Sequence, residues 1–131
     1  RPSPYTLGGF RRLIFQEGSW GGQWHPAFEP APGDVMVSEH WNSSGFANTN
    51  LDVQLRQRGI EQIVLVGMIA NTCLETTGKF GAELGYHVTL VTNATAAFSA
   101  EGMKVAHEIN GPTFAHAIVD AAAIIAAFAA A

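Results

Sequence analysis

The sequence predicts an α/β fold in which a parallel sheet is covered by helices on both faces. Apolar, β-branched runs alternate with segments of helical period at least three times after residue 49. This alternation is typical of βαβ units, which build parallel sheets. The run 60–66 is almost continuously apolar, as expected of a strand that is buried on both faces.

The first half of the chain contains few regular elements. Residues 1–34 are dense in Pro and Gly and show no period, so we expect them to be irregular. A short β-branched run predicts a strand over 35–38. Two leucines four residues apart predict a helix over 49–58, which Gly59 can close. The strand 60–66 follows.

The second half alternates regularly. We expect a helix over 74–84, a strand over 87–92, a helix over 101–109 and a strand over 114–119. The inward face of the first of these helices is predicted to carry Leu74, Thr77, Gly81 and Leu84. Ser99 is the expected cap of the helix 101–109, and Asp120 is expected to begin an Ala-rich helix at the C-terminal end.

Composition excludes several classes of protein. Hydrophobic residues make up 47% of the chain and charged residues 14%, far from the composition of disordered chains. A net charge of −4 with only 7 Lys and Arg argues against a nucleic-acid surface. No apolar run reaches the roughly 18 residues that span a membrane. The length of 131 residues fits a single domain.

The single cysteine and the low charge content predict the setting of the protein. One cysteine cannot form an internal disulfide, so we expect a reducing, cytoplasmic location. A high apolar fraction with few charges leaves apolar surface to be covered, so we expect a homo-oligomer.

That cysteine, Cys73, follows the predicted strand 60–66 closely. Thr72 and Glu75 have the T-x-x-E spacing of a capping box, which makes Cys73 the first residue of the next helix, at the carboxyl edge of the sheet. The helix N-terminus favours a thiolate, and its free N–H groups can hold an oxyanion. A nucleophile and its anion hole would then occupy one turn.

Two other interpretations of Cys73 remain open at this point. A lone cysteine in an apolar chain is commonly a small buried hydrophobic residue. It can also be a thiol redox sensor, although the chain offers no resolving partner.

The surrounding sequence resembles the nucleophile region of the isochorismatase-like cysteine hydrolases. Their motif G-[VIM]-x-[TSA]-x-x-C-[VLI]-E is matched by the segment 67–75, and a Gly-Tyr pair and an Asn-Ala-Thr turn follow at the family's positions. Upstream, "SGFANTNLDVQLRQRGI" resembles a second family stretch, and "NGPTFAHAIVD" suits a subgroup of these hydrolases. The resemblance covers about residues 33–120.

The resemblance implies a three-layer α/β/α fold with a mostly parallel, Rossmann-like sheet. It implies that Cys73 attacks the carbonyl of a small amide-like substrate and forms a thioester, which water then hydrolyses. It also implies a cis peptide bond between Met68 and Ile69, which turns the Ile69 N–H toward the Cys73 N–H to complete an oxyanion hole. Met68 is expected to contact the substrate.

Two positions depart from the family pattern. The family's general base is an aspartate at the end of a first strand; no such strand precedes residue 35, so we expect a single domain over 1–131 without its N-terminal strand and helix. Asp34 is not assigned this role. The family's lysine, four residues before Ser44, is replaced by His40, or by Glu39 with a one-residue slip. His40, when charged, could donate to the thiolate or to the leaving group.

No metal or other cofactor is predicted. The five histidines form no i,i+4 pair and only one cysteine is available, whereas zinc needs three or four convergent ligands. Trp20, Trp24, Trp41 and Phe46 form an aromatic set in the loops. Trp20 and Trp24 are expected to anchor loops in the core rather than to form a pocket wall or a subunit contact. Trp41, beside His40, is equally compatible with a wall of the substrate pocket.

The missing lysine leaves a second function open. A family member without catalysis would keep the fold and the pocket and act as a protein for binding small molecules or for assembly.

Overall fold

The computed structural model describes residues 1–130, which form two compact units, Arg1–Val37 and the chain from Ser38 onward. The first unit contains α1 (Leu7–Arg11) and two single 3₁₀ turns, η1 (Trp20–Gly22) and η2 (Pro26–Phe28). None of its side chains is buried.

The expected core role of Trp20 and Trp24 is wrong. Trp20 is 90% exposed and Trp24 58% exposed, because the first unit has no core of its own for them to enter. The predicted strand over 35–38 is also wrong, since none of the described strands pairs with these residues. A β-strand needs a neighbour for its ladder of hydrogen bonds.

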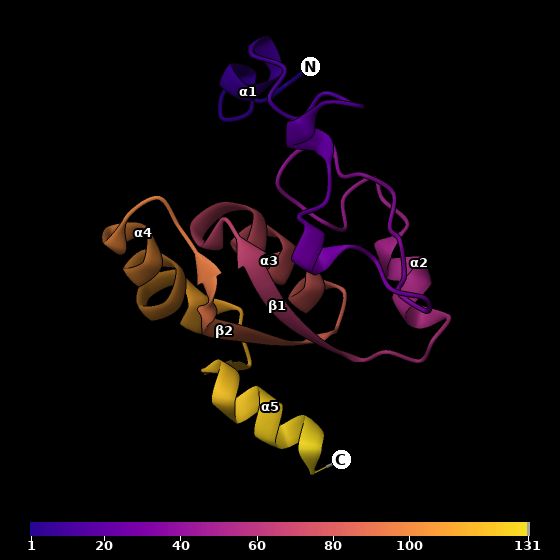
Figure 1. Cartoon of the computed structure of the whole chain (residues 1–131). Coiled ribbons are helices and arrows are strands. Elements are labelled where there is room, and N and C mark those ends of the chain that lie inside the picture. The colour runs from indigo at the N-terminus through magenta and orange to yellow at the C-terminus, as the bar shows by residue number, and fades with distance from the viewer. Residues whose placement is uncertain (131) are drawn as a thin grey trace. The chain divides into compact units, whose positions relative to one another are not determined.

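The second unit is built on the predicted parallel sheet. Its strands are β1 (Gln62–Met68), β2 (His87–Ala96) and β3 (Ala117–Val119), paired in that order and all parallel (Figure 1). The helices between and around them are α2 (Leu51–Arg56), η3 (Ala70–Leu74), α3 (Glu75–Glu83), α4 (Ala100–Lys104), η4 (Val105–Asn110), η5 (Gly111–Thr113) and α5 (Ala121–Ala129). No helix within residues 1–130 is long and apolar enough to cross a bilayer.

Two helix caps follow the sequence prediction. The Ser99 hydroxyl accepts the N–H of Gly102 at 3.1 Å and begins α4. The Asp120 carboxylate accepts the N–H of Ala123 at 2.8 Å and begins α5. Figure 1 shows α3 and α5 on opposite sides of β2, as expected for a sheet between two helical layers.

Helix α3 packs on the sheet through two glycines. A Cβ atom at Gly78 would lie 2.4 Å from the Phe114 ring, and one at Gly81 would lie 2.7 Å from Ile63 Cδ1. Both contacts are closer than real Cβ atoms reach, so any larger residue would force the Phe114 ring or the Ile63 side chain to move.

The predicted inward face of α3 is only partly correct. Leu74 and Gly81 are buried, but Leu84 is 37% exposed. Leu84 lies outward because the helix ends there, and Gly85, with a φ of 90°, turns the chain away.

Strand β1 is not covered on both faces, contrary to the prediction. Its side chains Val64, Val66 and Met68 are 37%, 57% and 69% exposed, whereas Ile63 and Leu65 face α3. Alternate residues of a strand point to opposite faces. The continuous apolar run therefore supplies one buried face and one exposed apolar face.

Tyr86 joins the end of α3 to α2. Its ring is 2% exposed and stacks on Phe46, and its hydroxyl donates to Asp52 Oδ1 at 2.7 Å. The Arg56 guanidinium donates to Asp52 at 3.0 Å and lies over the Tyr86 ring. Burial raises the pKa of Tyr86, and the Asp52 carboxylate raises it further.

We predict that Tyr86→Phe lowers the free energy of unfolding by about 1–2 kcal/mol, because it leaves Asp52 without its hydroxyl donor. Urea denaturation measures this loss, and Tyr5→Phe, at a 53% exposed position, is the matched control. Because the folded-state pKa of Tyr86 is raised, its stabilising contribution is complete below about pH 10 and is lost at higher pH. If the free energy of unfolding of Tyr86→Phe declined at alkaline pH as much as that of wild type, this assignment would be contradicted.

Candidate active site

Cys73 lies in the turn that connects β1 to α3. Gly67, with a φ of 108°, permits the bend at the end of β1. The Met68–Ile69 peptide bond is cis, as the resemblance implied. The chain then enters η3, a single π-helical turn over Ala70–Leu74, in which Cys73 is half-buried.

The carbonyl oxygen of Ile69 organises this turn. It accepts the N–H of Thr72 at 3.1 Å and the N–H of Leu74 at 3.2 Å. The Thr72 hydroxyl lies 3.4 Å from the same oxygen and 3.7 Å from Cys73 Sγ. Leu74 is 8% exposed and anchors the turn in the core, while Cys73 beside it is half-buried.

The predicted capping box between Thr72 and Glu75 is wrong. Helical structure begins at Ala70, so Cys73 is the fourth residue of the turn and not the first. The Thr72 hydroxyl bonds back to Ile69, and neither η3 nor α3 has a side-chain cap.

Glu75 instead ties the Cys73 turn to a distant helix. Its carboxylate accepts from Lys79 Nζ at 2.6 Å and from the Asn110 amide at 3.0 and 3.1 Å. The Glu75 side chain is only 12% exposed. It therefore connects the start of α3 to the end of η4.

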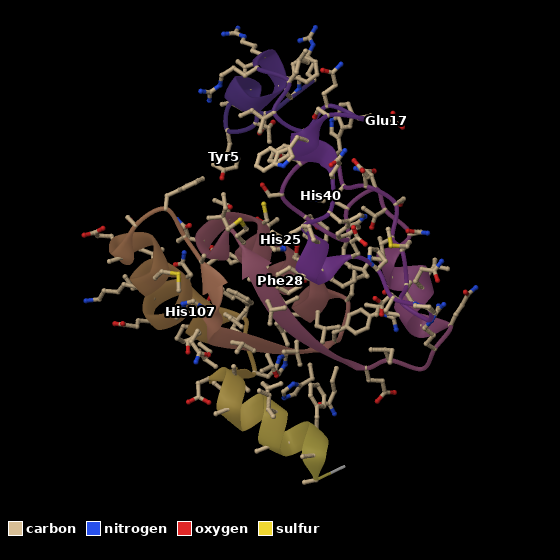
Figure 2. All side chains as sticks on the ribbon, viewed as in Figure 1. Tyr5, Glu17, His25, Phe28, His40 and His107 are labelled. Carbon is tan, nitrogen blue, oxygen red and sulfur yellow. The ribbon has the colours of Figure 1, made fainter. Side chains whose placement is uncertain are left out.

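The predicted partners of Cys73 are brought together only in part. Met68, Ile69 and Cys73 share one short segment at the carboxyl end of β1. His40 (labelled in Figure 2) lies on the loop before α2 and is exposed, and its ring Nδ1 bonds to the carbonyl of Asn42. The described hydrogen bonds do not join His40 to Cys73.

Trp41 borders an open cavity of about 350 Å³. The helix α3 contributes Thr76 and Phe80 to its wall, which lie one and two turns beyond Cys73 on the same stripe of the helix. Cys73 itself is not among the lining residues. The complete lining is uncharged and consists of Trp41, Asn42, Ser43, Ser44, Ala47, Asn48, Thr76 and Phe80.

Two further contacts near this turn were not predicted. The Thr95 hydroxyl at the end of β2 lies 3.1 Å from His107 Nε2, and Gly102 of α4 lies against Asn71. Thr95 belongs to the Asn-Ala-Thr turn, which was the only sequence signal for this region. His107 resembled an ordinary structural histidine.

The histidines do not gather around an ion. Within residues 1–130, His, Cys, Asp and Glu side chains form no group of three or more that could hold a metal. Two of the histidines, His87 and His116, stack their rings at 4.7 Å between centroids.

Comparisons with known proteins agree with the sequence resemblance. The isochorismatase domain model matches residues 1–121. The chain is 34% identical over 110 residues to the ureidoacrylate amidohydrolase RutB of Methylobacterium radiotolerans and 33% identical over 98 residues to that of Variovorax paradoxus. These matches cover 84% and 75% of this chain but 42% and 38% of the relatives, so the chain spans about two fifths of their length.

A solved structure shares the fold over most of the chain. The cysteine hydrolase of Pseudomonas syringae pv. phaseolicola is 25% identical, with a TM-score of 0.83. The match covers 95% of this chain and 63% of that protein. The predicted α/β fold and the family resemblance are thereby confirmed.

We predict that Glu75→Ala lowers the free energy of unfolding by about 1–3 kcal/mol, because the half-buried Asn110 amide loses its acceptor. Glu83→Ala, at an exposed position near the end of the same helix, is the control and should stay within about 0.5 kcal/mol of wild type. Urea denaturation of both variants measures the difference. Equal losses would show that Glu75 acts only as a surface charge.

Proposed function

Because the chain belongs to the isochorismatase family, we propose that it takes part in hydrolysis of a small molecule with an amide-like C–N bond, with Cys73 as the nucleophile. The observation that carries this proposal is the position of the only thiol. Cys73 is half-buried in the turn that directly follows the carboxyl end of β1, where open α/β sheets bind their ligands. The names of the curated relatives and of the solved neighbour support amide chemistry at a cysteine.

The reaction proceeds in two steps. The Cys73 thiolate attacks the carbonyl carbon and forms a C–S bond, and the electron pair moves to the carbonyl oxygen. The C–N bond then breaks, and the leaving amine takes up a proton. Water attacks the resulting thioester, which releases the acid and restores the thiol.

Backbone N–H groups stabilise the oxyanion in this proposal. We assign this role to the N–H groups of Ile69 and Cys73, four residues apart in one turn. The turn is held by the two hydrogen bonds to the Ile69 carbonyl and by the buried Leu74. Fixed donors at the developing negative charge lower the barrier without reorganisation.

Side chains around the turn take the remaining roles. We assign Met68 and Trp41 to substrate contact, because Met68 is 69% exposed beside Ile69 and Trp41 borders the uncharged cavity next to α3. We assign His40 to the position of the family's lysine, where its charged form donates a proton to the leaving amine. This role requires the bond between His40 and the Asn42 carbonyl to be exchanged when substrate binds.

The protein is further proposed to be cytoplasmic and homo-oligomeric. The exposed apolar side chains of β1 support association, because they form a contiguous apolar face on an edge strand.

The alternative is a family member that binds a small molecule without hydrolysing it. The contact of His40 with Asn42 favours this alternative, because a cationic partner for the sulfur is then missing from the described contacts.

We predict that Cys73→Ala abolishes turnover of small primary amides and ureido compounds while the thermal midpoint stays close to that of wild type. Iodoacetamide should label one thiol in the wild-type protein, faster than in the urea-unfolded chain. Mass spectrometry and ammonia release measure the two outcomes. Residual turnover by Cys73→Ala, or labelling no faster than in urea, would contradict a catalytic thiol.

We predict that His40→Ala lowers kcat by about 100-fold, because the leaving amine loses its proton donor, and that His40→Lys retains most of the activity. Glu39→Ala is the neighbouring control. Steady-state kinetics on the same amides decide between the two positions, since a loss in Glu39→Ala alone would transfer the role to Glu39.

A further inference from the structure

We propose that His107 is a positioning residue for the Cys73 turn and acts through Thr95 at the end of β2. This inference rests on the proposed function, because it assigns His107 to the geometry of the same nucleophile. The sequence and the family comparisons give His107 no role.

The pairing of β1 with β2 is interrupted just before the Cys73 turn. Leu65 pairs with Leu90, and the next described pair joins Gly67 to Thr95. Strand β1 thus advances by two residues (65 to 67) while β2 advances by five (90 to 95). A bulge of this kind breaks the regular ladder, so the position of Thr95 is not fixed by the strand register alone.

Side-chain hydrogen bonds hold Thr95 beyond this bulge. Its hydroxyl lies 3.2 Å from the Thr92 carbonyl and 3.1 Å from His107 Nε2, and it shares its one proton between these two neighbours. His107 Nδ1 lies 3.0 Å from the Met103 carbonyl one turn earlier in its own helix. A carbonyl only accepts, so Nδ1 carries a proton and the ring is fixed between Met103 and Thr95.

Thr95 lies opposite the last residues of β1. It pairs with Gly67, and Ala96 pairs with Met68, the residue before Ile69. A displacement of Thr95 would therefore shift the strand end that carries Ile69. The carbonyl of Ile69 in turn holds the N–H groups of Thr72 and Leu74 on either side of Cys73.

The helical segment that carries His107 also contacts the Cys73 turn directly. Gly102 leaves room for the Asn71 side chain, whose Nδ2 lies 3.4 Å from where a Cβ at Gly102 would stand, and Asn110 binds Glu75. Figure 2 shows His107 projecting from this segment toward β2. Between these two direct contacts, the bond to Thr95 holds the end of β2 that pairs with the end of β1, where the turn begins.

Matched substitutions can test the bond without removing the side chain. In His107→Gln the longer side-chain amide still reaches Thr95, as Nε2 of the histidine does. In His107→Asn the shorter amide reaches only the Met103 carbonyl of its own helix. Thr95→Val removes the hydroxyl at constant shape, and Thr95→Ser keeps it. These two pairs address the same hydrogen bond from opposite sides, so one remains informative if the other fails to fold.

We expect His107→Asn and Thr95→Val to lower kcat for amide hydrolysis by about tenfold with little change in KM, and to slow iodoacetamide labelling of Cys73 by about threefold or more. His107→Gln and Thr95→Ser should retain near-wild-type values. In the double variant His107→Asn/Thr95→Val, the losses should not add, because both changes remove one interaction.

The labelling rate separates this inference from the proposed function. If wild type hydrolyses no amide, or if Cys73→Ala retains turnover, the proposed function fails, while labelling still reports how the thiol is positioned. The inference itself is overturned if His107→Asn labels at the wild-type rate, if His107→Gln is as impaired as His107→Asn, or if the two losses are additive. A lowered thermal midpoint with unchanged labelling and unchanged kcat would show a purely structural role.

Discussion

The close packing of α3 against the sheet is the constraint on which the site depends. At Gly78 and Gly81 the helix backbone comes so near to its neighbours that a methyl group would overlap the Phe114 ring or the Ile63 side chain of β1. This contact fixes the distance and direction of the helix. The turn that carries Cys73 connects the helix to the end of β1 over only a few residues, so its position follows from the positions of both.

The same packing explains why motifs far apart in the sequence occur together. Tyr86, directly after α3, is buried and reaches back to Asp52 in α2, while Glu75, at the start of α3, reaches forward to Asn110 in η4. Both ends of the helix are therefore tied to neighbouring elements by polar contacts. The helix that positions the thiol is held along its length by glycine packing and at its ends by hydrogen bonds.

Much of the fold could be predicted from the sequence because it depends on local patterns. The caps at Ser99 and Asp120 need only residues within the next turn, and both are observed. The prediction of a capping box at Thr72 failed for a non-local reason, because Glu75 binds the side-chain amide of Asn110, 35 residues away. The exposed face of β1 was not predicted, because a continuous apolar run does not reveal whether one face of a strand is covered or both. The location of Cys73 after β1 was predictable, but the contact between Thr95 and His107 was not, since it depends on a bulge in the pairing of two strands.

The backbone at Gly67 restricts how this site can vary. A residue with a side chain is strained at a φ of 108°, so few amino acids other than glycine suit the bend before the Cys73 turn. The Trp41 side chain has no comparable restriction, since it is 69% exposed and borders open space. A mutant library that tests the proposed substrate contact should therefore randomise Trp41 and keep the glycine bend invariant. Divergence among natural homologues should be distributed in the same way.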